Sequence, residues 1–114
     1  MDNKILGDKG ENLAYDYLKK QGLKILERNY KNKIGEIDII CYNKQDDEIC
    51  FVEVKTRSSK EFGLPCEAVN FRKQHKIRKV AELYLIIQKK LNSNVRFDVL
   101  EVLNNEITYI KYAF

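Results

Sequence analysis

Cysteine, histidine and proline are scarce in this sequence. Its 114 residues contain 3 cysteines, 1 histidine, 1 proline and 5 glycines. The number of cysteines is odd, and no two of them have C-x-x-C spacing; they are Cys41, Cys50 and Cys66. This argues against both a disulfide framework and a zinc site. Because His75 is the one histidine, a multi-histidine metal site is excluded and a Ser-His-Asp triad is disfavoured.

Long hydrophobic runs are also missing. The longest apolar run covers residues 83–87, whereas about 20 apolar residues are needed to cross a bilayer. The start of the chain, Met1 to Lys4, has no signal-peptide pattern. We therefore expect a cytoplasmic protein with no membrane partner.

The composition is that of a globular protein. Hydrophobic residues make up 44% and charged residues 33% of the chain, and no internal repeat or Pro/Gly/Ser linker interrupts it. Compact domains usually run to about 100–200 residues. We therefore expect a single domain over residues 1–114.

Positive charge is concentrated in the second half of the chain. The net charge is +4 overall, and residues 55–114 hold 12 basic and 6 acidic residues. Much of the excess lies in one predicted helix, with Lys55, Arg57 and Lys60 just before it. Such a basic stretch is either the footprint of a polyanion such as DNA or a solvated helix face, and charge alone does not choose between them.

Hydrophobic spacing predicts two helices and five strands. The helices cover residues 9–21 and 69–91, and the strands cover residues 23–30, 35–42, 49–57, 95–103 and 107–114. The stretch from Ser58 to Cys66 reads as a loop. The order α-β-β-β-α-β-β implies an α/β fold, a mixed five-stranded sheet flanked by helices. The connection through the second helix is long enough for the strands before and after it to run parallel.

Two acidic residues lie in otherwise apolar strands. If the six residues 43–48 close a simple hairpin, Tyr42 faces Ile49, and Asp38 then faces Glu53. Directly opposed residues have Cβ atoms about 5 Å apart, so these carboxylates would repel each other unless a cation or a shared proton intervened. The same register makes Cys41 and Cys50 neighbours on the opposite face.

A divalent metal would relieve this repulsion. Carboxylate oxygens are the ligands that Mg²⁺ prefers, and one or two of them are usually enough. Alternation places Lys55 on the same face as Glu53, where it would bind or deprotonate a water or neutralise a phosphate. Alone, an E-x-K in a strand is most often structural, and Asp38 alone would be an edge-strand charge. Glu11 lies on the inward stripe of the first helix with Ala14 and Leu18, although a helix-start glutamate is an equally good explanation.

Several motifs together resemble a known family. They are Glu11, Gly35-Glu36-Ile37-Asp38, Phe51-Val52-Glu53-Val54-Lys55-Thr56-Arg57, Lys73-Gln74 and Arg96-Phe97-Asp98-Val99. In this order they resemble the YraN-like family of small bacterial proteins, which is functionally uncharacterised. That family is similar in motif order to the PD-(D/E)XK nucleases, in particular to archaeal Holliday-junction resolvases. The resemblance implies a restriction-endonuclease-like fold.

The resemblance also implies a role for each matching residue. Asp38, Glu53 and the backbone carbonyl of Val54 would hold Mg²⁺ or Mn²⁺, Lys55 would position the water, and Glu11 would support the metal. Gln74 would match an assisting glutamine, although the tyrosine that follows four residues later in some nucleases is an arginine in this sequence. The expected DNA-binding residues are Arg57, Arg72, Lys73 and Lys76. Because symmetric resolvases are dimers, a homodimer through the last strand is a further expectation.

Three functions are compatible with these features. The first is a metal-dependent endonuclease that hydrolyses phosphodiester bonds in branched or otherwise structured DNA. The second is a catalytically inactive nucleic-acid-binding or repair-accessory protein of the same fold. The third is a protein–protein adaptor that uses Tyr109 and Tyr112 as exposed aromatic side chains.

Overall fold

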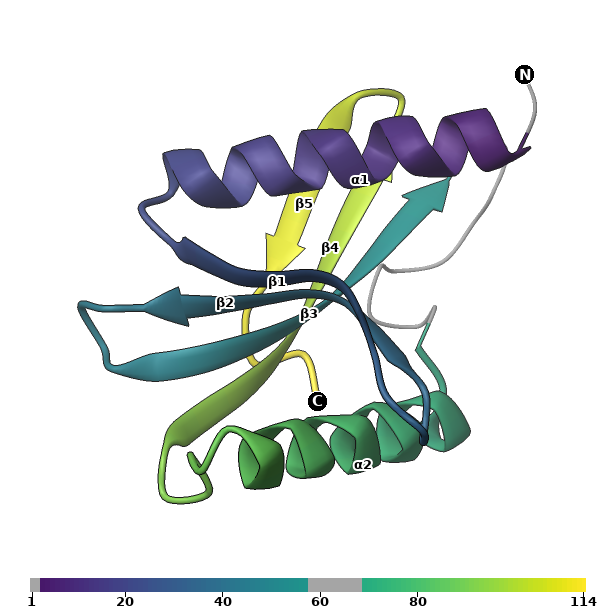
Figure 1. Ribbon diagram of the computed structural model, residues 1–114. Helices are drawn as coiled ribbons and strands as arrows, with labels where there is room; N and C mark the ends of the chain where they lie inside the picture. Colours follow the sequence, from purple (N-terminus) through teal and green to yellow (C-terminus); the bar gives the residue numbers. More distant parts are fainter. Residues whose placement is uncertain (1–2, 58–68) are drawn as a thin grey trace.

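The computed structural model describes residues 3–57 and 69–114. The described residues form two helices and five strands in the predicted order α-β-β-β-α-β-β (Figure 1). These are α1 (Asn3–Lys20), β1 (Lys24–Lys31), β2 (Glu36–Asn43), β3 (Glu48–Arg57), α2 (Phe71–Ile87), β4 (Asn94–Leu103) and β5 (Glu106–Ile110). The predicted α/β fold class is confirmed. The predicted loop from Ser58 to Cys66, with Lys60 in it, lies outside the described residues.

All five strands belong to one mixed sheet. They lie side by side in sequence order, β1-β2-β3-β4-β5. Neighbouring strands are antiparallel except for β3 and β4, which run parallel and are connected through α2. The predicted crossover through the second helix is therefore confirmed.

The register between β2 and β3 is the one that the sequence predicts. Tyr42 lies opposite Ile49, and Cys41 lies opposite Cys50. Both cysteines are free thiols in the core. Because side chains alternate along a strand, this register fixes which residues of both strands share a face.

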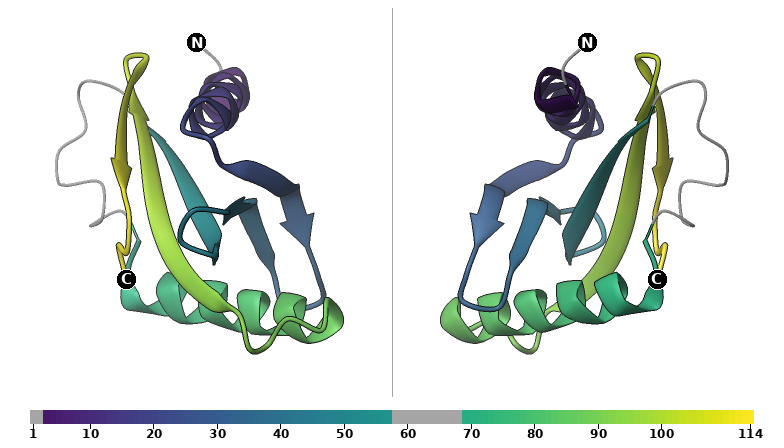
Figure 2. Two further views of the ribbon diagram at one scale, coloured as in Figure 1. Left: turned by 90° about the vertical axis from the view of Figure 1, so that its left-hand side faces the viewer. Right: turned by 90° about the vertical axis from the view of Figure 1, so that its right-hand side faces the viewer.

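Each helix covers a different face of the sheet. On one face, Cys41, Cys50 and Val52 of the sheet pack with Ala14 and Leu18 of α1. The core on the other face contains larger side chains, among them Phe51 and Phe97 of the sheet and Tyr84 of α2. Figure 2 shows the strong twist of the sheet and the separation of the two helices. The central strands β3 and β4 are buried over consecutive residues because both faces of the sheet are covered, and alternate residues belong to opposite faces.

Helix α2 is shorter than predicted at both ends. It begins at Phe71 because the side chain of Asn70 accepts a hydrogen bond from the backbone N–H of Lys73 and caps the helix. It ends at Ile87. Two residues later Lys89 has a φ of 56°, a left-handed conformation that is incompatible with a continuing α-helix. Neither described helix is long and apolar enough to cross a membrane.

The last strand is also shorter than predicted, because it ends at Ile110 and not at Phe114. Tyr112 has a φ of 53°, so the chain turns there. The backbone N–H of Ala113 then donates a 2.7 Å hydrogen bond to the carbonyl of Phe97. The ring of Phe114 stacks on that of Phe97 at a centroid distance of 5.4 Å. The end of the chain is therefore packed against β4 and does not extend β5.

Candidate metal and nucleic-acid site

Strands β2 and β3 separate beyond the pair of Ile39 and Val52. We call this opening the fork, and the candidate site lies in it. The ladder between the two strands ends there, although β2 continues to pair with β1 as far as Glu36. Beyond this point a side chain takes the place of the backbone ladder. The carboxylate of Asp38 accepts a 2.7 Å hydrogen bond from the backbone N–H of Val54.

Strand β2 leaves β3 because the β1–β2 turn is held by α2. The side-chain amide of Asn32 donates a 3.2 Å hydrogen bond to the backbone carbonyl of Val80. Gly35 packs so closely against α2 that a Cβ atom there would lie 3.1 Å from both Lys76 and Val80. Glycine is therefore the residue that lets this turn reach the helix.

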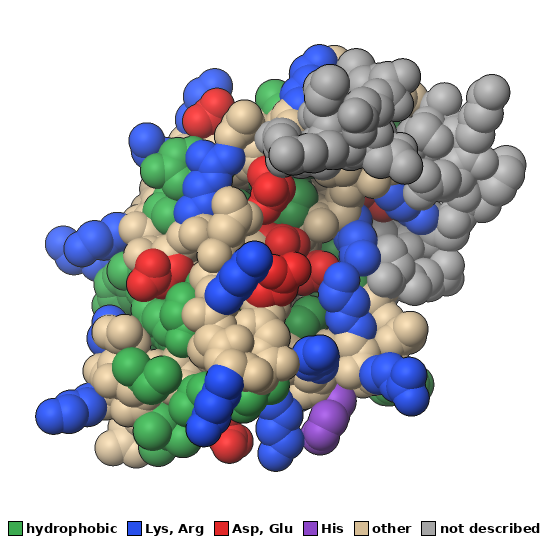
Figure 3. Space-filling model, turned by 45° about the vertical axis from the view of Figure 1, so that its right-hand side comes forward, with side chains coloured by type: hydrophobic (Ala, Val, Ile, Leu, Met, Phe, Trp, Pro, Cys, Tyr) green, Lys and Arg blue, Asp and Glu red, His purple; other side chains and the backbone are tan. Residues whose placement is uncertain are grey.

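The fork opens into a cleft of about 560 Å³ between β2, β3 and α2. Figure 3 shows acidic side chains gathered in the middle of this side of the molecule, with Lys and Arg around them. The residues that line the cleft include three carboxylates and four lysines; they are Lys31, Asn32, Gly35, Glu36, Asp38, Glu53, Val54, Lys55, Lys73, Lys76 and Ile77. Two buried strands thus deliver acidic groups to a basic rim.

The carboxylates of Asp38 and Glu53 affect each other. Burial, the negative charge of Glu53 and that of Glu11 raise the pKa of Asp38 to about 7, against the opposing effects of the Val54 hydrogen bond and of Lys73. Glu53 is 7% exposed. A carboxyl group with so high a pKa is held in a site that disfavours a second negative charge. The site therefore favours a bound cation or a shared proton.

Two lysines supply positive charge next to Glu53. The ammonium of Lys73 lies 2.7 Å from Glu53 Oε1, and that of Lys55 lies 3.9 Å from the same oxygen. Burial and the neighbouring Lys73 lower the pKa of Lys55. Burial opposes the charge of Lys73, but its hydrogen bond to Glu53 and the negative charges of Glu53 and Asp38 act in the opposite direction, and the net effect raises the pKa of Lys73. The ion pair with Glu53 therefore belongs mainly to Lys73.

The donor atoms at the fork are those that suit Mg²⁺ or Mn²⁺. Asp38 and Glu53 offer carboxylate oxygens, and Val54 lines the same cleft. The N–H and C=O of one strand residue point to the same side, so the Val54 carbonyl faces β2 as its N–H does. No group of three or more His, Cys, Asp or Glu side chains in the described part of the chain is arranged to hold a metal. A metal here would thus take two carboxylates and complete its shell with other oxygens, as Mg²⁺ commonly does.

The structure places Glu11 and Gln74 differently. Glu11 of α1 is close enough to raise the pKa of Asp38 but does not line the cleft. The side-chain amide of Gln74 donates a 2.8 Å hydrogen bond to the carbonyl of Val69, just before α2. That bond gives Gln74 a role in holding the start of the helix, and Gln74 does not line the cleft.

The four residues expected to bind nucleic acid fall into three environments. Arg57 is 12% exposed in its side chain, and its Nε lies 2.8 Å from a carboxylate oxygen of Glu101. Arg72 is exposed on α2. Lys73 and Lys76 line the cleft. The sequence predicts Lys73 as a nucleic-acid-binding residue but does not predict its pairing with Glu53, because only the tertiary packing of α2 brings the two together.

A second polar cluster, buried near the C-terminal end of the chain, was missing from the sequence predictions. Arg96 and Asp98, two residues apart on β4, have side chains that are 1% and 0% exposed. The guanidinium of Arg96 donates a 2.9 Å hydrogen bond to Asp98 and lies 3.5 Å from Glu48 of β3. Two opposite charges at this spacing inside an apolar strand were the available signal.

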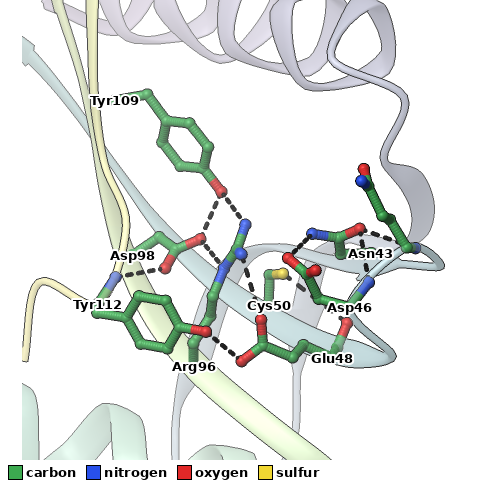
Figure 4. Close-up of polar contacts among 9 residues, drawn as sticks. Asn43, Asp46, Glu48, Cys50, Arg96, Asp98, Tyr109 and Tyr112 are labelled. Atoms are coloured by element: carbon green, nitrogen blue, oxygen red, sulfur yellow. Dashed lines mark hydrogen bonds and ion pairs between the residues drawn. The ribbon is translucent and has the colours of Figure 1, made fainter.

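Two tyrosines complete this cluster (Figure 4). The hydroxyl of Tyr109 donates to Asp98, and that of Tyr112 donates to Glu48. The backbone N–H of Tyr112 donates a further 3.0 Å hydrogen bond to Asp98. Tyr109 is therefore half-buried, contrary to the expectation of an exposed side chain, whereas Tyr112 is 62% exposed. The cluster ties the turn after β5 to β3 and β4.

The sequence matches a family model over residues 10–102, which include every residue of the fork. The chain belongs to the uncharacterised protein family UPF0102. The resemblance to the YraN-like family is thereby confirmed. A UPF0102 protein of Clostridioides difficile is 53% identical over 116 residues and is matched over the full length of both chains. One of Clostridium acetobutylicum is 49% identical over 118 residues, covering 98% of this chain and 95% of that protein.

One solved structure aligns with most of this chain. It is that of Pyrococcus furiosus SfsA in complex with Ca²⁺. The TM-score is 0.40 and the sequence identity is 15%. The alignment covers 96% of this chain, which spans 64% of that chain.

Proposed function

We propose that this protein is a metal-dependent endonuclease that hydrolyses phosphodiester bonds in branched or otherwise structured DNA, with Mg²⁺ or Mn²⁺ as its cofactor. One observation carries the proposal. The fork between β2 and β3 brings Asp38 and Glu53 into one cleft with Lys55 beside them. Two carboxylates and a lysine in such an arrangement suit metal-assisted hydrolysis of a phosphodiester.

The residues at the fork, together with Glu11 outside the cleft, have distinct tasks in this proposal. Asp38, Glu53 and the carbonyl of Val54 would hold the metal, which supplies polarisation of a phosphate oxygen and activation of water. The Val54 N–H fixes the carboxylate of Asp38, so its orientation does not depend on the metal. Lys55 would hold the attacking water and offset negative charge at the phosphate. Glu11 would act through its charge on Asp38.

The basic rim fits a polyanionic substrate. Lys73 and Lys76 border the carboxylates, and the exposed Arg72 lies in the first turn of the same helix. Phosphate contacts from lysine and arginine supply most of the affinity of proteins for nucleic acid irrespective of sequence. A DNA backbone that follows this rim would place one phosphodiester over the fork.

A catalytically inactive nucleic-acid-binding protein is the second candidate. It is favoured by the 2.7 Å ion pair between Lys73 and Glu53, which already balances one carboxylate without a metal. In that case the acidic residues would be structural charges. DNA binding would then be independent of Mg²⁺ and unaffected by the change Lys55→Ala.

Calorimetric titration of Mn²⁺ into the wild-type protein and into Asp38→Asn tests the metal site. Asparagine keeps an oxygen that accepts the Val54 hydrogen bond but lacks the negative charge, so folding is preserved while the metal loses a ligand charge. We expect saturable binding to the wild type and at least a tenfold loss of affinity in the variant. Asp46→Asn, in the exposed turn between β2 and β3, is the matched control.

Cleavage assays with four-way junction, flap and single-stranded DNA test the activity. We expect cleavage of at least one of these substrates with Mg²⁺ or Mn²⁺, and none with Asp38→Asn or Lys55→Ala. Metal-independent DNA binding without cleavage would support the inactive binder. If the wild type binds no metal, with or without DNA, the endonuclease proposal is wrong.

A further inference from the structure

The ammonium of Lys73 contacts a carboxylate oxygen of Glu53 to which a metal would bind. Lys73 Nζ is 2.7 Å from Glu53 Oε1, whereas the side chain of Glu53 is 8% exposed. Its charge also reaches Asp38, where it counteracts the repulsion from Glu53. A lysine ammonium is a compact, strongly hydrated point charge. Lys73 thus supplies positive charge to both carboxylates, which is part of what a divalent cation would do.

The position of Lys73 in its helix is unfavourable on local grounds. It is the third residue of α2, and the first turn of that helix contains no acidic residue. Cations near a helix N-terminus are disfavoured by the helix dipole, and acidic residues are preferred there. The backbone of Lys73 is nevertheless fixed by the Asn70 cap. The contact with Glu53 offsets this cost, which points to a role in the site.

Two cations at contact distance from one carboxylate oxygen repel each other, so each weakens the binding of the other. A metal bound to Glu53 would repel the ammonium of Lys73, and Lys55, 3.9 Å from the same oxygen, would add to the crowding. The side chain of Lys73 is 44% exposed, so it has room to turn toward the mouth of the cleft. At the mouth it would need a new anionic partner, and a phosphate group of DNA is such a partner.

We propose that Lys73 is an exchangeable internal counter-ion that couples metal binding to substrate binding. When no phosphodiester is in the cleft, Lys73 contacts the carboxylate oxygen of Glu53 that the metal would bind, and so weakens metal binding. When a phosphodiester enters the cleft, Lys73 moves to the phosphate and releases Glu53 to the metal. The inference rests on the proposed function and adds to it: the site loads its metal preferentially in the presence of a polyanion.

Metal titration without DNA tests the competition directly. The variant Lys73→Met keeps most of the apolar stem and loses the charge, so we expect it to bind Mn²⁺ about three- to tenfold more tightly than the wild type. Lys73→Arg keeps the charge and should bind as weakly as the wild type. Lys79→Met, an exposed lysine of the same helix that does not line the cleft, is the matched control and should change nothing.

The second measurement is the effect of a bound cation on the affinity for DNA. If the metal and DNA favour each other's binding, each must raise the affinity for the other by the same factor. Fluorescence anisotropy with labelled DNA, with Ca²⁺ as the cation and without it, should show a gain of about threefold or more for the wild type. Lys73→Met should bind DNA more weakly and lose most of this gain. Thermal unfolding shows whether each variant is folded, and Lys73→Gln replaces Lys73→Met if the latter is not.

The two proposals fail in different ways. If metal binding needs Asp38 but the wild type and Lys73→Met bind the metal with equal affinity, the counter-ion role is overturned. The endonuclease proposal then remains intact. Weaker metal binding by Lys73→Met has the same consequence. Absence of metal binding from every variant, with and without DNA, overturns both proposals.

Discussion

The backbone N–H of Val54 donates a 2.7 Å hydrogen bond to the carboxylate of Asp38 at the point where β2 and β3 stop pairing. A side chain thus satisfies a strand N–H that the ladder would otherwise have used. This substitution lets the strands separate without leaving a buried donor unpaired. It also holds a carboxylate in the fork, next to Glu53, and so joins the opening of the sheet to the candidate chemistry.

The high pKa of Asp38 makes the stability of the metal-free protein depend on pH. Its pKa is about 7 in the folded protein against an ordinary value of 3.8, so the folded state binds this proton more tightly than the unfolded state does. The contribution of this group to stability is therefore present below about pH 4 and is lost as the pH rises to 7. We expect Asp38→Asn to raise the stability at pH 8 by roughly 1–3 kcal/mol.

Thermal unfolding of the wild type and Asp38→Asn in the presence of a chelator measures this effect. The difference in melting temperature should shrink when the pH is lowered from 8 to 5. Asp46→Asn controls for a general effect of removing one negative charge. A difference that does not depend on pH would show that Asp38 is not the titrating group.

The contact between α1 and β3 leaves no room for a side chain at Gly10. A Cβ atom at this position would lie 2.0 Å from the hydroxyl oxygen of Thr56. We expect Gly10→Ala to destabilise the protein by about 1–3 kcal/mol, although alanine favours helices, because the helix must move away from the sheet. Denaturant unfolding measures the change, and adding Thr56→Ala should recover part of it. The same shift would displace the adjacent Glu11 from Asp38.

The buried cluster around Arg96 and Asp98 is expected to respond strongly to single changes. Arg96→Met leaves Glu48 and Asp98 in the interior without their cation, so we expect a loss of about 3–5 kcal/mol. Tyr109→Phe removes one hydrogen bond to Asp98 and should cost about 1–2 kcal/mol. Unfolding of the two single variants and the double variant gives their coupling. Strict additivity would contradict a connected network.

Lys76 and Arg57 should behave differently, although both were expected to bind DNA. Lys76→Ala should weaken DNA binding and lower the slope of log affinity against log salt by about 0.7–0.9, since one phosphate contact is lost. Arg57→Ala should instead lower stability, because Arg57 is the partner of the buried Glu101. Anisotropy at several salt concentrations measures the slopes. Lys44→Ala, in the exposed β2–β3 turn, is the control and should leave the slope unchanged.

Sequence reasoning was most reliable where a local pattern is enough. The alternation in strands β2 and β3, together with the short turn between them, predicted the pairing of Cys41 with Cys50. It was less reliable at element ends, where single hydrogen bonds decide. The Asn70 cap moved the start of α2, and the contact of Tyr112 with Asp98 ended the last strand early. Neither contact leaves a periodic signal.

The order of the elements, the faces of the strands and the register that directs Asp38 and Glu53 to one side can all be predicted from the amino-acid pattern. These follow from periods of 2 and 3.6 residues and from the closure of a short turn. Only the tertiary structure decided that β2 leaves β3 at Asp38, through a hydrogen bond between Asn32 and Val80, 48 residues apart. It also brought Lys73 onto Glu53. Periodicity predicts the face of a strand or helix on which a side chain lies. Which faces come into contact depends on how the whole chain packs.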